Sequence, residues 1–201
     1  AAGTSYIRAH AMDHYFQPTV DAYLTDRNTE SLMKTIIHYG PIALKEPENY
    51  EARANLMWAS SLGLNHILTV GKGGAWSCHP IEHELSAYYD ITHGEGLAIV
   101  TPAWMKAVLC DTTVERFAMF GRNVWDITEG DDREIAEKAI EKTADFFKSL
   151  GLPSTLKKVG INAEKFEEMG EEAVRTSGIY TRSYYHLNKE DIVKIYESCA
   201  E

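Results

Sequence analysis

The sequence predicts an all-α protein, and three observations lead to that prediction. Apolar side chains recur every three to four residues through most of the 201 residues, as on one face of a helix. Runs that alternate between apolar and polar residues, as strands do, are almost absent. Helix-capping residues precede several periodic stretches, among them Asn188 with Asp191 three positions later. A chain of this length suits a single helical domain.

About nine helices account for the pattern. The clearest spans residues 133–150, with an apolar stripe that runs from Ile135 to Phe147. Glycine and proline set the expected ends, so that Gly40-Pro41 closes the second helix and Gly121 closes the sixth. Pro102 is expected to kink or restart its helix. The expected helices lie at residues 4–16, 21–39, 50–69, 79–89, 93–109, 113–120, 133–150, 163–176 and 189–199.

Charge and hydropathy exclude several classes of function. The 30 acidic and 20 basic residues give a net charge of −10 without any basic run, so we expect no nucleic-acid partner. No segment approaches the roughly 18 apolar residues that span a bilayer, and the polar start is not a signal peptide. Residues 71–74 contain a Gly-Lys pair but lack the spacing of a phosphate loop, so a flexible turn is expected. The unclustered Cys78, Cys110 and Cys199 indicate reduced thiols and a cytoplasmic location.

The stretch from residue 76 to 97 carries three histidines, His79, His83 and His93. His79 and His83 are four residues apart, so on a helix they share a face. His93 follows a break, where Thr92 and Glu95 have the spacing of a capping box. The positive end of the following helix favours a neutral His93 imidazole, the form that binds metal. Each histidine alone is typical of an ordinary polar or core position, but the three together indicate a zinc or iron site.

A different chemistry is also consistent with residues 79–83. His79, Glu82 and His83 fit H-x-x-E-H, the pattern of the inverted zincin metallopeptidases. In that interpretation the two histidines bind zinc and Glu82 acts as the base. Cys78 is interpreted as a small buried thiol rather than as a soft metal ligand.

The chain resembles the metal-binding half of the iron-containing (group III) alcohol dehydrogenases, especially the butanol dehydrogenase branch. The resemblance rests on His79, on His83 four residues later and on His93-Gly94 ten residues after that. It continues through AAGT at the start, PIALKEPENYEARANLMWASSLGLN, NVWDITEG, FFKSLGLPSTLKKVGI and the closing LNKEDIVKIYE. It implies that residues 1–201 form the C-terminal, dehydroquinate synthase-like helical bundle of the family. The family's N-terminal nucleotide-binding domain is expected to be absent from this chain, since no Gly-rich turn follows a strand pattern.

The resemblance also implies a reaction. Family members interconvert primary alcohols and aldehydes by hydride transfer to or from NAD or NADP, with Fe²⁺ or Zn²⁺ polarising the substrate oxygen. A small alcohol or aldehyde is then the substrate. NAD or NADP binds only where a nucleotide-binding domain is present. We expect this chain to form a homo-oligomer or to act with such a domain.

Matching the family motif assigns His10, His79 and His93 as metal ligands. It assigns His83 as the candidate catalytic residue, close to the substrate and the nicotinamide. The family's fourth ligand, an aspartate, falls on Tyr6, whose phenol has an ordinary pKa near 10 and is a poorer ligand than a carboxylate. Three imidazoles alone can still hold zinc and leave one position open.

The departure at Tyr6 leaves a non-enzymatic interpretation open. His14 and Asp13 lie near His10 on the same expected helix, and either could compensate for the lost carboxylate. Without such compensation, the chain is a helical relic or partner domain that binds no metal. Whether it is an enzyme therefore depends on the site that the fold builds.

Overall fold

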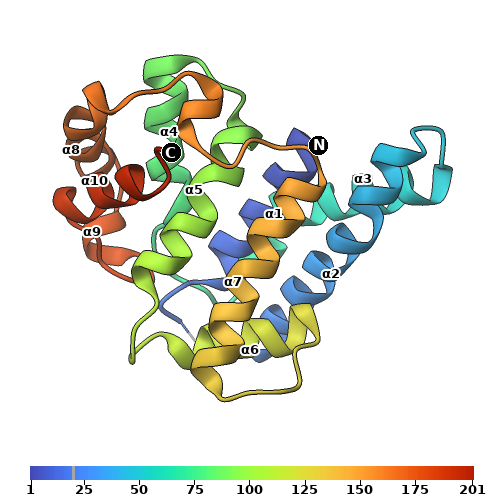
Figure 1. Cartoon of the computed structure of the whole chain (residues 1–201). Helices are drawn as coiled ribbons and strands as arrows, with labels where there is room; N and C mark the ends of the chain where they lie inside the picture. The colour runs from blue at the N-terminus through green and yellow to red at the C-terminus, as the bar shows by residue number, and fades with distance from the viewer. Residues whose placement is uncertain (20) are drawn as a thin grey trace.

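The computed structural model describes residues 1–19 and 21–201 and consists of helices joined by short loops (Figure 1). No strand occurs within this described part, which confirms the all-α fold class. None of its helices is long and apolar enough to cross a bilayer. The α-helices are α1 (Ala2–Tyr15), α2 (Tyr23–Lys45), α3 (Tyr50–Leu64), α4 (Cys78–Tyr89), α5 (His93–Val108), α6 (Val114–Trp125), α7 (Asp132–Ser149), α8 (Phe166–Thr176), α9 (Ile179–Arg182) and α10 (Lys189–Ser198). Short 3-10 turns are η1 (Ile67–Thr69), η2 (Leu156–Val159) and η3 (Ala163–Lys165).

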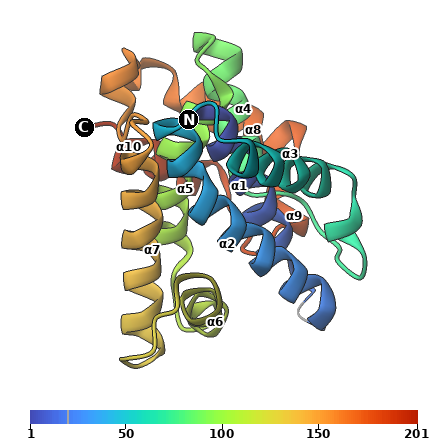
Figure 2. The same cartoon turned by 90° about the vertical axis from the view of Figure 1, so that its right-hand side faces the viewer.

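Helix α1 runs through the middle of the molecule and packs against α2, α3, α4 and α5. Figure 1 shows α2 and α3 extending to one side of it and α8 and α10 lying on the other. Helices α6 and α7 pack on each other as a hairpin, with α6 across the lower end of the long α7 in Figure 2. An aromatic core joins these layers, since the ring of Phe16 stacks on Phe117 at 4.6 Å and lies 5.6 Å from the fully buried Trp104.

The helix ends expected at Gly40-Pro41 and at Gly121 are wrong, and the helix does not restart at Pro102. Helix α2 continues through Gly40 and Pro41 to Lys45, and α5 continues through Pro102. A Cβ at Gly40 would lie 2.8 Å from Thr4 Cγ2 on α1. A Cβ at Gly121, inside α6, would lie 2.6 Å from Ile135 Cγ2 on α7. Both glycines therefore mark close helix contacts rather than helix ends.

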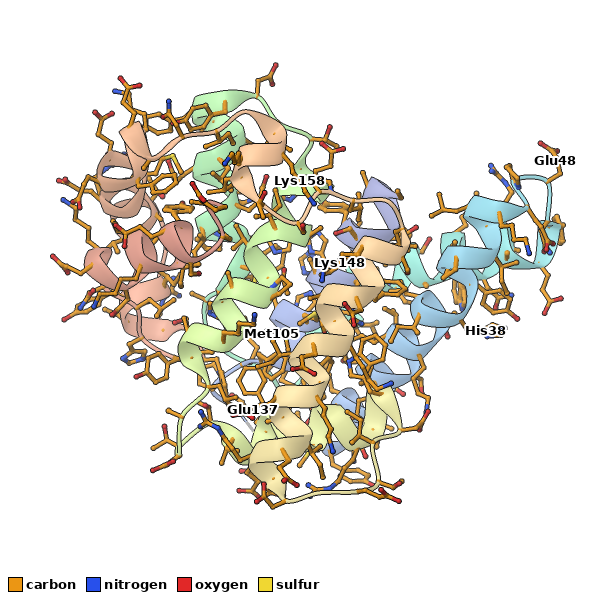
Figure 3. The ribbon with its side chains drawn as sticks, viewed as in Figure 1. His38, Glu48, Met105, Glu137, Lys148 and Lys158 are labelled. Atoms are coloured by element: carbon orange, nitrogen blue, oxygen red, sulfur yellow. The ribbon has the colours of Figure 1, made fainter. Side chains whose placement is uncertain are left out.

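The arm formed by α2 and α3 departs from the apolar face that helical spacing predicts for residues 21–39, in which Tyr23 and Leu24 lie on the buried side. Tyr23 and Leu24 are each 71% exposed, although their spacing placed them on the buried side of α2. Helix α3 ends at Leu64 instead of residue 69, and its apolar residues Met57 and Trp58 are exposed. Figure 3 shows Glu48 at the outer end of this arm, between the two helices. Asn49 caps α3 as expected, since its side chain accepts a hydrogen bond from the N–H of Ala52.

A buried ionic network holds the segment around residue 72 in place, contrary to the flexible turn expected there. The Lys72 ammonium pairs with Asp26, and both side chains are almost fully buried. The Arg116 guanidinium donates to both oxygens of Asp26, at 2.6 and 2.7 Å. Burial alone would raise the pKa of Asp26, but the hydrogen bonds from Arg116 and Lys72 outweigh it and lower that pKa. The network ties α2, α6 and the segment before α4 together.

Arg8 on α1 is a buried cation without a carboxylate partner in the described part of the chain. Its Nη2 donates to Thr143 Oγ1 at 3.1 Å, whereas Nε and Nη1 have no hydrogen-bond partner. Four aromatic rings surround the guanidinium, and that of Trp125 is nearest, at 4.9 Å. Burial lowers the pKa of Arg8 to about 9. The aromatic faces attract the cation but do not replace the lost hydration.

We expect Arg8→Met to raise the free energy of unfolding by about 1–4 kcal/mol, the gain typical when apolar side chains replace buried charges. Methionine fills similar space and leaves no donor unpaired. Denaturant titration at neutral pH measures the change. The matched control is Arg175→Met on α8, where the arginine is exposed and its replacement is expected to shift stability by less than about 0.5 kcal/mol. A less stable Arg8→Met protein would mean that the aromatic contacts outweigh the desolvation cost.

Candidate metal and substrate site

The first helix places the N-terminal part of the site. Tyr6 and His10 are one turn apart on α1, so both project from the same face. His10 is buried, with 3% of its surface exposed, and Tyr6 is partly buried. Helix α1 is enclosed by four other helices, which accounts for the burial of polar side chains along it.

The structure brings His10, His79 and His93 together from α1, α4 and α5. The ring centre of His79 lies 4.3 Å from that of His10 and 5.3 Å from that of His93. The Tyr6 ring lies against the same group, 4.4 Å from His10 and 5.2 Å from His93. Tyr6 therefore occupies the place beside the imidazoles where the family resemblance expects a carboxylate.

His83 lies at the open side of this group. Its ring is 5.8 Å from His79 and 5.3 Å from His93, and the residue is exposed. Trp76 closes the opposite side, with its ring 4.9 Å from His10 and 4.6 Å from His79. The candidate catalytic residue is thus the imidazole that an incoming substrate can reach.

Asp13 has a role that sequence reasoning missed. Its carboxylate accepts hydrogen bonds from the backbone N–H groups of Ser77, Cys78 and His79, which begin α4, and its Oδ2 lies 2.5 Å from His79 Nδ1. Helix α4 has no side-chain cap of its own. Asp13 from α1 therefore caps α4 across the interface. No local sequence signal identifies this contact, because the partners are more than 60 residues apart.

Of the two expected compensating residues, neither joins the imidazoles as a further donor. Both oxygens of Asp13 are engaged at the start of α4. The His14 ring lies edge-on against Trp76, at 5.4 Å.

Glu82 is fully buried on α4 and its two oxygens are also engaged. Oε2 pairs with His93 Nδ1, and Oε1 accepts a hydrogen bond from the Ser86 hydroxyl at 2.7 Å. The metallopeptidase interpretation needs Glu82 free to act as a base, so this arrangement argues against it. The expected capping box at Thr92 is wrong, because the Thr92 side chain makes no cap hydrogen bond, although His93 does begin α5.

Three histidines in and beside the site, His10, His83 and His14, have lowered pKa values. Burial lowers the pKa of His10 to about 3, with the neighbouring His79 adding to the effect. Although His83 is exposed overall, partial desolvation of its imidazole lowers its pKa as well, with His79 and His93 adding to the effect. The pKa of His14 is lowered as well, chiefly by burial. Neutral imidazole is the form that binds metals and that accepts protons.

The donor atoms fit a divalent metal. Both ring nitrogens of His10 and Nε2 of His79 are buried and have no hydrogen-bond partner among residues 1–19 and 21–201, a state that normally costs free energy. Imidazole nitrogens are good ligands for zinc and for ferrous iron. In the described part of the chain, however, no group of three His, Cys, Asp or Glu side chains stands ready to hold an ion. The fit therefore rests on the unpartnered nitrogens and not on a finished coordination shell.

The fold and the site together define a class of protein: an all-α domain in which imidazoles from three helices offer donor atoms that suit a divalent metal. The chain belongs to the Fe-containing alcohol dehydrogenase family, because residues 6–200 match the model of that family's C-terminal region. This confirms the resemblance inferred from the histidine spacing.

Three relatives each match 80% or more of the chain. It is 50% identical over 198 residues to NADH-dependent butanol dehydrogenase A of Clostridium acetobutylicum, which covers 98% of this chain and 51% of the relative. Butanol dehydrogenase B of the same organism is 51% identical, again with 98% and 51% covered. The NADPH-dependent aldehyde reductase YqhD of Escherichia coli is 40% identical over 80% of this chain and 43% of its own. The chain thus spans about half the length of these relatives.

Solved structures agree with the fold. Butanol dehydrogenase A of Thermotoga maritima superposes with a TM-score of 0.91 at 33% identity, covering 100% of this chain and 52% of its own. The cofactor-free form of Escherichia coli YqhD superposes with a TM-score of 0.90 at 34% identity, covering 98% and 52%. The helical arrangement described above is therefore that of one half of these enzymes.

The lowered pKa of His10 predicts acid sensitivity. In the unfolded chain the imidazole protonates near pH 6.5, whereas in the folded chain it stays neutral until about pH 3. The stability that depends on a neutral His10 is therefore complete above pH 6.5 and is lost as the pH falls toward 3. From pH 6.5 to pH 5 the expected loss is up to about 2 kcal/mol in the free energy of unfolding.

Denaturant unfolding of the metal-free chain at several pH values measures this loss. We expect His10→Gln to reduce the slope of stability against pH, with the remainder due to His14 and His83. The matched control is His38→Gln, at an exposed position on α2 labelled in Figure 3. Equal slopes for the wild-type and His10→Gln chains would show that His10 can be protonated without unfolding.

Proposed function

We propose that this chain is the metal-binding and catalytic half of an NAD(P)-dependent, iron- or zinc-containing alcohol dehydrogenase that interconverts primary alcohols and aldehydes. The observation that carries the proposal is the group formed by His10, His79 and His93, in which three buried ring nitrogens, both of His10 and Nε2 of His79, have no hydrogen-bond partner among the described residues. The chain that holds this group is 50% and 51% identical to two butanol dehydrogenases. Residues 1–201 form the helical metal-binding domain in this proposal.

The nucleotide binds outside these residues. The described residues contain no strand and thus no strand–turn–helix unit of the kind that binds dinucleotides. A nucleotide-binding domain, in the same polypeptide or another, is therefore the proposed partner, and a homo-oligomer is the alternative arrangement. Relatives are named for NADH and for NADPH, so the proposal covers both nucleotides. We also propose a cytoplasmic location, in keeping with free thiols at Cys78, Cys110 and Cys199.

Each residue of the site has a separate role in the proposed reaction. His10, His79 and His93 would hold the metal, which when bound supplies a Lewis acid at the substrate oxygen. Trp76 packs against His10 and His79 and excludes water from their far side. His83 faces the open side as a neutral imidazole, so one of its ring nitrogens can accept the alcohol proton and return it in aldehyde reduction.

A second candidate function is a helical domain that no longer binds metal or catalyses a reaction. The specific observation in its favour is the Tyr6 ring, which lies among the imidazoles in the absence of a ready group of three ligands. A phenol brings no charge unless its proton is lost, and that loss is costly at neutral pH. The two candidates therefore differ in how the site responds when a carboxylate replaces Tyr6.

We expect Tyr6→Asp to bind zinc at least about tenfold more tightly than the wild-type chain, a gain of about 1.4 kcal/mol, in calorimetric titration. The carboxylate would project from the same face of α1 as His10 and offset part of the metal's charge. Tyr6→Asn serves as the control that removes the ring without adding a charge. Equal zinc affinity in Tyr6→Asp and wild-type chains would mean that residue 6 does not reach the metal.

Activity is tested in a chimera that joins residues 1–201 to the N-terminal half of Clostridium acetobutylicum butanol dehydrogenase A, the portion that this chain does not cover. The alcohol dehydrogenase proposal expects NADH-dependent reduction of butanal, enhanced by Tyr6→Asp and abolished by His10→Ala. A folded, zinc-loaded Tyr6→Asp chimera without such activity would favour the non-catalytic alternative.

A further inference from the structure

Two buried carboxylates contact two of the three imidazoles at the same ring atom. Asp13, 1% exposed, approaches Nδ1 of His79, and Glu82, 0% exposed, approaches Nδ1 of His93. The third imidazole, His10, has no such partner. The carboxylates come from different helices, α1 and α4, so the pairing is not a product of helical spacing.

The surroundings of Asp13 define which proton the His79 ring carries. An ionised carboxylate only accepts hydrogen bonds, so a ring nitrogen beside it must carry a proton. Asp13 already accepts three backbone N–H groups at the start of α4, which stabilise its ionised form. His79 therefore carries its proton on Nδ1, and its buried, unpartnered Nε2 presents a lone pair.

The surroundings of Glu82 lead to the same result for His93. The Oε1 of Glu82 accepts a hydrogen bond from the Ser86 hydroxyl, and its Oε2 is the oxygen that contacts Nδ1 of His93 and can accept the proton of that ring nitrogen. Gly96 leaves room for this carboxylate, since a Cβ there would lie 2.4 Å from Glu82 Oε1. The space for Glu82 thus depends on a glycine one turn beyond His93.

We propose that Asp13 and Glu82 are positioning residues that hold His79 and His93 in the tautomer with the proton on Nδ1, so that both rings present Nε2 as the donor. The metal that these donors serve rests on the function proposed above. His10 has no hydrogen-bond partner among the described residues, so no neighbouring group selects the tautomer of its ring. Two of the three imidazoles therefore present a defined donor atom before any metal binds.

Asparagine and glutamine substitutions at the two positions have different expected outcomes. In Asp13→Asn, either orientation of the amide sets its NH₂ against backbone donors. The orientation that keeps the Ser77 and Cys78 hydrogen bonds directs the NH₂ at His79, which can accept only after its proton moves to Nε2. In Glu82→Gln, the carbonyl still accepts from His93, and the NH₂ donates to the Ser86 hydroxyl, which can donate in turn to the Ile91 carbonyl at 3.4 Å.

Nitrogen-15 NMR of the metal-free chain at about pH 8, where ordinary imidazoles are neutral, reads the tautomer of each ring. We expect His79 and His93 to carry Nδ1–H in the wild-type chain. Asp13→Asn is expected to move the His79 proton to Nε2, whereas Glu82→Gln, the matched loss of one buried charge, leaves His93 unchanged. A wild-type ring with Nε2–H, an unchanged His79 in Asp13→Asn or a moved proton in Glu82→Gln would overturn the assignment for that residue.

Zinc titration of the same chains then measures how much the tautomer contributes to zinc affinity. We expect Asp13→Asn to weaken zinc binding about 10–100-fold and Glu82→Gln to weaken it less than about tenfold. A purely structural role for Asp13 would lower stability without moving the His79 proton. If Asp13→Asn fails to fold, the wild-type and Glu82→Gln spectra still decide the assignment. Correct tautomers in a wild-type chain that binds no zinc would support the positioning roles and overturn the proposed function.

Discussion

The contact between the Asp13 carboxylate and the first turn of α4 is the interaction on which the rest of the site depends. It satisfies backbone N–H groups that α4 cannot satisfy with a side chain of its own. It also fixes α4 against α1, the two helices that carry His79 and His10. Because the hydrogen bonds are buried and charge-assisted, they are stronger than those of an exposed cap. One carboxylate thus joins secondary structure, helix packing and the orientation of an imidazole.

The buried polar groups of the central helix α1 differ in how completely they are hydrogen-bonded. Asp13 is fully hydrogen-bonded, His10 lacks partners on both ring nitrogens, and Arg8 has only Thr143 and a set of aromatic rings. These residues face different sides of α1, so the helix turns its cation toward α6 and α7 and its imidazole toward α4. A buried polar group without a partner lowers stability, and in a site it leaves an atom free to bind a ligand. His10 and Arg8 illustrate the two cases within one turn of helix.

The position of the Tyr6 ring bears on both the stability of the fold and the binding of metal. Its ring fills the space beside His10 and His93, so the imidazoles are packed against an apolar surface and not against a carboxylate. Such packing stabilises the fold without a metal. The family to which the chain belongs, in contrast, is named for the iron that its members contain. The site also has an exposed imidazole, His83, at its open side and a buried carboxylate, Glu82, that contacts Nδ1 of His93.

The fold class and most helices could be predicted from sequence because they follow from local periodicity and capping. Asn188 with Asp191 forms the expected capping box, and Asn49 caps α3. The ends expected at Gly40-Pro41 and Gly121 were wrong, since a glycine at a helix crossing looks the same in sequence as a glycine at a helix end. The exposure of the apolar residues Tyr23 and Trp58 could not be predicted, because burial depends on which helix lies opposite.

The candidate site, like the fold, could be predicted from sequence only in part. The sequence by itself determined the residue types, with His79, His83 and His93 at a spacing that one helix and one turn bring close together, and the family match added His10. The same match placed Tyr6 beside the imidazoles, where the structure has it. Only the tertiary structure decided that Asp13 caps α4 and that Glu82 is paired with His93. The physical reason is that local periodicity sets which face a side chain occupies, whereas a buried carboxylate finds its donors on another helix, at a distance along the chain that no local rule encodes.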